Sequence, residues 1–219
     1  TPFKDSNPAC PPESRYKALG RGSGGLYAFQ SADGIRWSLM SDQPVIRKGA
    51  FDSQNLAFWD PHTKQYREYH RAFRGVRDIM TGTSDDFLHW TDPVFLEYPD
   101  APQEHLYTNA IQPYERAPHI LLGFPTRFQP SHSQVEPILM SSRDGRTFHR
   151  WNEPVIPITA PKDRDGNRSN YMTWGLVQLP GKPREYSVYA TEAYYTGPDS
   201  RLRRFRYRVD GFASVRAAD

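Results

Sequence analysis

The chain has 219 residues, of which 37% are hydrophobic and 14% aromatic, and its formal net charge is only +3. This length corresponds to one large or two small domains, and the aromatic content excludes an intrinsically disordered chain. The small charge predicts no nucleic-acid partner, the absence of a run of about 18 apolar residues predicts no membrane span, and the single Cys10 excludes an intrachain disulfide.

The N-terminal residues and the cation composition add two expectations. Residues 1–5 carry no apolar signal core, so we expect a secreted or periplasmic protein if a signal peptide was removed, and otherwise a cytoplasmic one. The chain contains 22 Arg but only 6 Lys. Because the guanidinium group makes planar, bidentate contacts to carboxylates and other polar ligands, we expect some of these arginines to bind a ligand.

The predicted elements are short strands. Twenty prolines and fifteen glycines interrupt the chain too often for long helices. Between them lie runs rich in Tyr, Phe, Val and Ile, many of which alternate polar with apolar residues as half-buried strands do. In chain order, these runs are 25–30, 56–59, 66–73, 120–124, 138–141, 186–190 and 202–209. The pattern predicts an all-β fold.

A repeated motif, the Ser-x-Asp turn, organises these strands. It begins at Ser31, Ser84 and Ser142, and each copy leads to an aromatic residue and then to a Pro-Val-Ile or Pro-Val-Phe segment. The three serines are 53 and 58 residues apart, a spacing close to that of one four-stranded propeller blade. We interpret the motif as scaffold, because Asp and Gly favour turns and the aromatic residues pack between blades.

The Ser-x-Asp turns resemble those of the five-bladed β-propeller glycosidases, the superfamily of invertase, levansucrase and arabinanase. Segments 51–55, 106–109, 123–127 and 208–215 look most similar to a bacterial group usually labelled glycoside-hydrolase-like. The resemblance covers nearly the whole chain and implies a β-propeller with about four recognisable blades. We place these blades at approximately 13–48, 51–98, 105–158 and 171–215, in one domain of 1–219.

The blade count predicts an incomplete propeller. The resemblance places the first catalytic Asp on the innermost strand of the first blade, and here that strand is either absent or reduced to Pro2–Asn7. An open ring would leave the faces around 16–19 and 186–189 uncovered, and exposed apolar faces and free strand edges favour association. We therefore expect a homo-oligomer or a companion chain that completes the propeller.

Propeller geometry predicts the site. The starts of the inner strands and the ends of the second strands meet at one end of the axis, so polar residues at these points should surround one cleft. They are Asp52, Asn55, Arg71, Asn109, Arg127, Trp174 and Glu192.

Sugar hydrolysis requires two carboxyl groups, and Asp52 and Glu192 are the acids at equivalent positions. We expect Asp52 to stay ionised among polar neighbours, and Glu192 to have a raised pKa and act as the acid. Asn55, Arg71, Asn109 and Arg127 would bind hydroxyls or an anionic substituent, and Trp174 would stack on the sugar.

Each residue also has a structural interpretation. Asp52 could close a turn, Glu192 could pair with Arg71 or Arg127, and Trp174 could belong to the core. Arg127 has no obvious packing need beside Pro125, which favours a ligand-binding role.

We predict a glycoside hydrolase that uses two carboxyl groups at the propeller mouth. The alternatives are a carbohydrate-binding propeller without catalysis and a metal-assisted hydrolase of esters or phosphoesters. No cofactor is required for the first two. The seven histidines are scattered without a metal-binding spacing. The resemblance nevertheless implies that a structural divalent ion could occupy the propeller axis.

Overall fold

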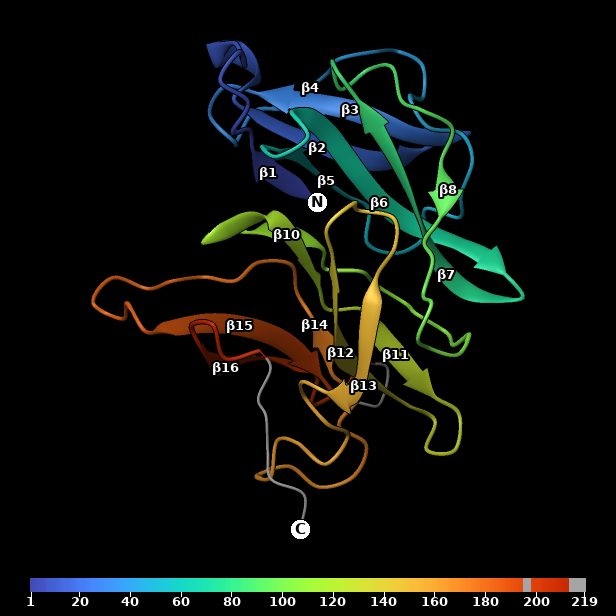
Figure 1. Cartoon of the computed structure of the whole chain (residues 1–219), viewed down its shortest axis with the longest axis vertical. Coiled ribbons are helices and arrows are strands. Elements are labelled where there is room, and N and C mark those ends of the chain that lie inside the picture. Colours follow the sequence, from blue (N-terminus) through green and yellow to red (C-terminus); the bar gives the residue numbers. More distant parts are fainter. Residues whose placement is uncertain (195–197, 213–219) are drawn as a thin grey trace.

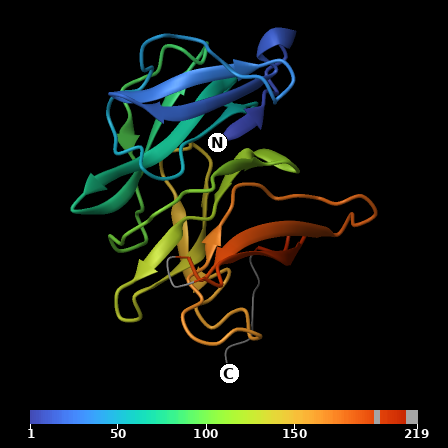
Figure 2. The same ribbon diagram turned by 180° about the vertical axis from the view of Figure 1, so that it is seen from behind.

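The computed structural model describes residues 1–194 and 198–212. Four antiparallel sheets lie around a common centre as the blades of a propeller, which confirms the all-β propeller fold (Figure 1). The described part contains a single short helix, the 3₁₀ turn η1 (Pro12–Ser14). No helix in this part is long and apolar enough to cross a membrane. Seen from either side, strands β1–β8 form the upper half and β9–β16 the lower half (Figures 1 and 2).

The first blade consists of β1 (Pro2–Lys4), β2 (Tyr16–Gly22), β3 (Gly25–Ser31) and β4 (Ser38–Leu39), paired in that order. The inner strand is therefore present, although it has only three residues. This outer strand β4 lies earlier than the Pro-Val-Ile segment at 44–46, which we expected to form the outer strand after the first Ser-x-Asp turn. Ile46 instead forms an isolated bridge with Leu26.

The second blade is the most regular. Its strands are β5 (Leu56–Asp60), β6 (Gln65–Arg74), β7 (Val76–Ser84) and β8 (Val94–Phe95). β6 and β7 form a long hairpin that turns at Gly75, where a φ of 77° suits glycine. Pairing across this hairpin places Phe73 opposite Arg77.

The third blade consists of β9 (Gln112–Tyr114), β10 (Ala117–Gly123), β12 (Gln134–Ser142) and β13 (His149–Pro154), while β11 (Thr126–Gln129) pairs with the first half of β12. The fourth blade has three described strands, β14 (Tyr171–Met172), β15 (Glu185–Glu192) and β16 (Arg201–Arg208). The last predicted residues of this blade, 213–215, lie outside the described residues.

Two apolar clusters hold the blades together. The larger one joins the first three blades and includes the fully buried Leu26, Tyr69 and Phe148. The smaller one joins the third and fourth blades around Tyr186 and Val188, which are also fully buried. Burial of a large side chain contributes about 1.5–3 kcal/mol, so these clusters fix how the blades pack.

The Ser-x-Asp turns are scaffold, as predicted. In the third copy, Ser142 Oγ accepts a hydrogen bond from the Gly145 amide at 2.9 Å, and Asp144 Oδ1 accepts from the amides of Arg146 and Thr147 at 2.8 and 2.7 Å. The copies at Ser31 and Ser84 repeat these bonds. Trp90 packs on the buried Phe87 with ring centroids 5.4 Å apart.

Candidate functional site

Asp52 lies in the loop before the inner strand β5, and Arg71 lies near the end of β6. Two hydrogen bonds join them, from Arg71 Nε to Oδ1 at 3.2 Å and from Nη2 to Oδ2 at 2.5 Å. Partial burial alone would raise the pKa of Asp52, but the hydrogen bonds and charge of Arg71, with a contribution from Arg21, hold it below the ordinary value. The side chain is 42% exposed. A lowered pKa agrees with the expectation of an ionised Asp52, but its main cause is Arg71 and not the polar neighbours of Asp52 in the sequence.

An aromatic ring lies against this ion pair. The guanidinium carbon of Arg71 is 5.6 Å from the centroid of the Tyr107 ring, and that of Arg77 is 4.8 Å from it. Both guanidinium groups are also 5.9 Å from the ring of Phe73, which is 58% exposed. We call Asp52, Arg71, Phe73, Arg77 and Tyr107 the rim cluster.

Sequence reasoning missed three members of the rim cluster: Phe73, Arg77 and Tyr107. Phe73 and Arg77 lie opposite each other beside the tip of the β6–β7 hairpin. An aromatic residue and an arginine on either side of a predicted hairpin turn could have indicated this part of the site. Tyr107 is two residues before the predicted Asn109, but its contact with Arg77 joins segments 30 residues apart and depends on tertiary packing.

Asn55 and Asn109 are buried and hold loops together. Asn55 Nδ2 donates to the carbonyl of Phe51 at 3.1 Å. Asn109 Nδ2 donates to the carbonyls of Gln54 and Tyr69 at 3.3 and 3.4 Å. The Asn55 bond closes the loop before β5, and the Asn109 bonds join the loop before β9 to that loop and to β6.

Glu192 departs from its prediction. It ends β15, and its carboxylate is fully buried between Arg201 and Arg203 of β16, with Arg203 Nε 2.9 Å from Oε2 and Arg201 Nε in contact with Oε1. Arg164 lies 3.5 Å away. Burial would raise the pKa of Glu192, but hydrogen bonds from Arg203 and Arg201 lower it below the ordinary value. The expectation of a raised pKa is wrong, because β16 places arginines beside the carboxylate.

Arg127 also has the packing partners that its sequence context did not suggest. It lies on β11 and is 4% exposed. Its Nη2 donates to Glu136 Oε1 at 2.8 Å and its Nη1 to Asn152 Oδ1 at 2.7 Å. The guanidinium group therefore joins β11, β12 and β13 within the third blade.

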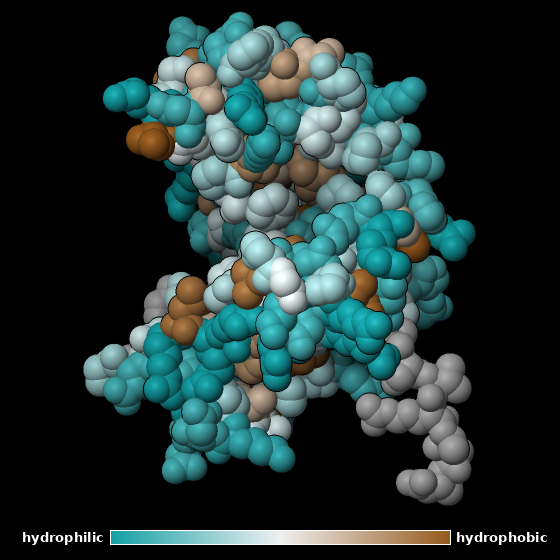
Figure 3. Space-filling view, turned by 90° about the vertical axis from the view of Figure 1, so that its left-hand side faces the viewer, coloured by the Kyte–Doolittle hydropathy of each residue, from teal (hydrophilic) through white to brown (hydrophobic). Residues whose placement is uncertain are grey.

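Trp174 follows β14 and lines a hollow at the centre of the molecule. Its indole nitrogen donates to the carbonyl of Ile111 at 2.9 Å, and its ring packs partly against the core. This axial pocket has a volume of about 430 Å³ and receives residues from all four blades, including Phe3, Phe58, Trp59, Gln112, Pro113 and Trp174. Figure 3 shows hydrophobic side chains inside the hollow between the upper and lower halves.

The axial pocket and Asp52 belong to opposite ends of the inner strands. Asp52 comes before β5, whereas Trp59 is the last residue but one of that strand and Pro61 follows the strand into the next turn. The pocket also contains Glu115, in the turn after β9. Trp174 therefore lines the axial pocket, which contains no residue of the rim cluster. The two features are separate sites in this structure.

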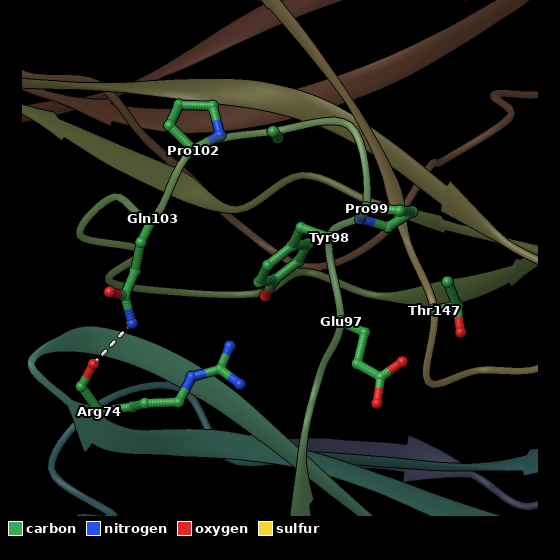
Figure 4. A pocket seen from close by; sticks show the side chains of 8 residues that line it. Arg74, Glu97, Tyr98, Pro99, Pro102, Gln103 and Thr147 are labelled. Carbon is green, nitrogen blue, oxygen red and sulfur yellow. Dashed lines mark hydrogen bonds between the residues drawn. The ribbon is translucent and has the colours of Figure 1, made fainter.

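A further pocket of about 380 Å³ lies beside the β6–β7 hairpin. Figure 4 shows Tyr98 in its middle, with Arg74 and Glu97 on one side and Pro102 on the other. Gln103 Nε2 donates to the Arg74 carbonyl at 2.7 Å, which ties the 97–103 loop to the hairpin. Arg74 itself is paired with Asp78 at 2.6 Å.

The described residues offer no obvious metal ligand set. Within 1–194 and 198–212, no three His, Cys, Asp or Glu side chains lie close enough together to hold an ion. Neither the expected divalent ion at the axis nor a metal-assisted hydrolysis gains support from these side chains.

Comparison with solved structures identifies the fold. The chain resembles β-1,2-mannobiose phosphorylase from Listeria innocua (TM-score 0.63, 12% identity, covering 89% of this chain and 57% of that one). It also resembles a thermostable family-43 glycoside hydrolase (TM-score 0.59, 13% identity, 88% and 66%). A third similar structure is an N-acetylgalactosamine deacetylase from F. plautii (TM-score 0.57, 13% identity, 81% and 58%).

These similarities confirm the expected β-propeller fold, and the similar structures include propellers of glycoside hydrolases. No known family model matches the sequence, and no curated protein is detectably similar to it. The chain spans less than two thirds of the length of the solved structures that it resembles here. At these identities the comparison establishes the fold alone.

Proposed function

We propose that this propeller binds carbohydrate at the rim cluster, with Asp52 as the carboxylate that faces the sugar. The observation that carries this proposal is the combination of a partly exposed, ionised carboxylate, a bidentate arginine and the exposed ring of Phe73 at one place. Carboxylate and guanidinium groups hydrogen-bond to sugar hydroxyls, and an aromatic face packs against the apolar face of a pyranose ring.

Hydrolysis of a glycosidic bond is the second candidate, favoured by the similar structures that are glycoside hydrolases. In this version Asp52 and Glu192 are the two carboxyl groups. Asp52 can serve as the ionised partner, since Arg71 lowers its pKa. Glu192 would first have to leave Arg201 and Arg203, because a general acid must carry a proton. This requirement makes binding the better supported function.

Binding is tested by screening the purified protein on an array of neutral and acidic plant and microbial oligosaccharides. We expect binding that is lost in Tyr107→Ala, because this variant removes the ring beside Arg71. Tyr27→Ala is the matched control, since Tyr27 lies on β3 of the first blade and is similarly half-buried. A wild-type protein that binds no sugar, or equal binding by both variants, would contradict the proposal.

Hydrolysis is tested separately with a panel of aryl glycosides. If the two-carboxylate mechanism operates, Asp52→Asn and Glu192→Gln each lower kcat by orders of magnitude. Unchanged rates in both variants, or oligosaccharide binding without any turnover, would leave binding as the function.

Assembly is the last part of the proposal. The stretches expected to be uncovered are in fact packed within the chain, since Leu19 is 2% exposed and Tyr186 and Val188 are fully buried. The feature that favours association with another chain is instead the axial pocket, whose lining includes two half-buried tryptophans. We propose that another chain, in the simplest case a second copy, covers this hollow.

A further inference from the structure

Arg77 differs from the other cations that lie over aromatic rings. Arg71, Arg74 and Arg150 each contact a ring, and each is also paired with a carboxylate, of Asp52, Asp78 and Glu104 respectively. Lys17 over Tyr66 is likewise paired with Asp5. Arg77 contacts Tyr107 and Phe73, yet no carboxylate of the described residues forms an ion pair with it. Among the described residues, its guanidinium group therefore lacks the direct carboxylate partner that the other four cations have.

The Arg77 backbone is fixed in place. Its amide donates to His105 Nδ1 at 3.1 Å, and its carbonyl accepts from the Leu106 amide at 2.9 Å. Because Nδ1 accepts this bond, a neutral His105 carries its proton on Nε2. The loop that ends in Tyr107 thus holds both the backbone of Arg77 and the ring under its guanidinium group. This arrangement orders the side chain before any ligand arrives.

The Nε atom of Arg77 is buried and has no hydrogen-bond partner in the described structure, a state that it shares with the Nε atoms of Arg67, Arg127, Arg150 and Arg164. What distinguishes Arg77 is that its guanidinium group lies over two rings without an ion-pair partner among the described residues. The Arg71 guanidinium lies over the same Tyr107 ring, and two cations share this place with the single carboxylate of Asp52.

We propose that Arg77, stacked on Tyr107, recognises the carboxylate of a uronate residue in the bound carbohydrate. The planar guanidinium fork matches a carboxylate in two parallel hydrogen bonds. Phe73, opposite Arg77 on the hairpin and 58% exposed, offers the apolar surface on which the pyranose ring packs. This inference rests on the proposed carbohydrate binding and narrows it to anionic sugars.

The test compares two forms of one ligand by isothermal titration calorimetry at low salt. The wild-type protein binds tetragalacturonate at least about ten-fold more tightly than its methyl ester, because a charge-assisted hydrogen bond is worth about 1.5–3 kcal/mol and 1.4 kcal/mol is ten-fold. Arg77→Gln reduces this preference to less than about two-fold, because it weakens binding of the acid far more than binding of the ester. Arg77→Lys keeps the charge without the fork and retains part of the preference.

Arg36→Gln is the matched control, because it removes the same charge from a side chain that is 90% exposed on the first blade. It keeps the full preference for the acid. Equal affinity of the wild-type protein for acid and ester, or a full preference in Arg77→Gln, would overturn the inference. If Arg77→Gln loses its cooperative melt, Phe73→Ala is titrated in its place. We expect this variant to bind both tetragalacturonate and its methyl ester more weakly.

The same titrations separate this inference from the function on which it rests. If Tyr107→Ala abolishes binding of the ester while Arg77→Gln keeps the full preference for the acid, carbohydrate binding stands and the uronate assignment is wrong. If neither form binds to the wild-type protein, both are wrong.

Discussion

At the scale of single residues, neighbouring arginines set the pKa of the two carboxylates that the sequence proposed as catalytic. Asp52 and Glu192 are both carboxylates whose pKa is lowered by paired arginines in spite of burial. They differ in access, since the Asp52 side chain is 42% exposed and that of Glu192 is fully buried. A solvent-accessible carboxylate can exchange its partner for a sugar hydroxyl, whereas a buried one mainly stabilises the fold. This difference assigns Asp52 to the candidate site and Glu192 to the fourth blade.

We expect Glu192→Gln to lower the free energy of unfolding by about 1–3 kcal/mol, because Arg201 and Arg203 would lose a buried charged acceptor. Urea denaturation at pH 7 measures this change. Glu185→Gln is the control on the same strand. Its side chain is 34% exposed and has one contact with Arg206 at 3.4 Å, so we expect less than about 0.5 kcal/mol.

The effect of Glu192→Gln should depend on pH. The folded pKa of Glu192 lies below the ordinary 4.5, so its stabilisation is complete above that value and is lost as the pH falls through the folded pKa. The stability difference between wild type and variant should therefore shrink in acid. A difference that stays constant down to strongly acidic pH would contradict the buried ion-pair role.

At the scale of elements, the Ser-x-Asp turns stabilise individual blades, whereas the β6–β7 hairpin places residues at the rim. The turns connect the third strand of a blade to its outer segment through short, local hydrogen bonds. The hairpin projects Phe73 and Arg77 toward Tyr107, which belongs to the loop before β9. The turns therefore depend on hydrogen bonds between residues close in sequence. The rim depends on packing between the second and third blades.

We expect Asp144→Ala to cost about 1 kcal/mol of stability, because the amides of Arg146 and Thr147 lose their acceptor Oδ1. Thermal melts of purified protein provide the measurement. Arg143→Ala changes an exposed neighbour in the same turn and should cost less than about 0.5 kcal/mol. Equal losses in the two variants would show that the carboxylate has no special role.

At the scale of the whole molecule, four blades surround a hollow that is lined by residues from each of them. Phe3 of the first blade and Trp174 of the fourth contribute to the same pocket. Apolar side chains in an open hollow favour coverage by another surface. The rim cluster lies toward the other ends of the inner strands, so coverage of the hollow is compatible with an open sugar-binding rim.

We expect multi-angle light scattering to give a mass of at least two 25.3 kDa chains. Ser6→Arg, in the exposed lining of the axial pocket, should lower this mass toward a single chain by adding bulk and charge. Ala32→Arg adds the same group at an exposed turn of the same blade and should leave the mass unchanged. A wild-type monomer at all concentrations would contradict self-association and leave a companion chain as the remaining partner.

The sequence by itself determined the features that depend on nearby residues. Alternating residues and frequent Pro and Gly indicated an all-β chain, and the Ser-x-Asp spacing indicated successive blades, because turns and strand faces form over a few residues. The lowered pKa of Asp52 depends on Arg71, which is 19 residues away in the sequence, so it belongs to the features that packing decided. Strand register and packing decided the rest. Pairing of β15 with β16 placed Arg201 opposite Glu192 and lowered its pKa, and blade packing brought Arg77 onto Tyr107. Long-range contacts of this kind leave no local periodicity, so only the tertiary structure could reveal them.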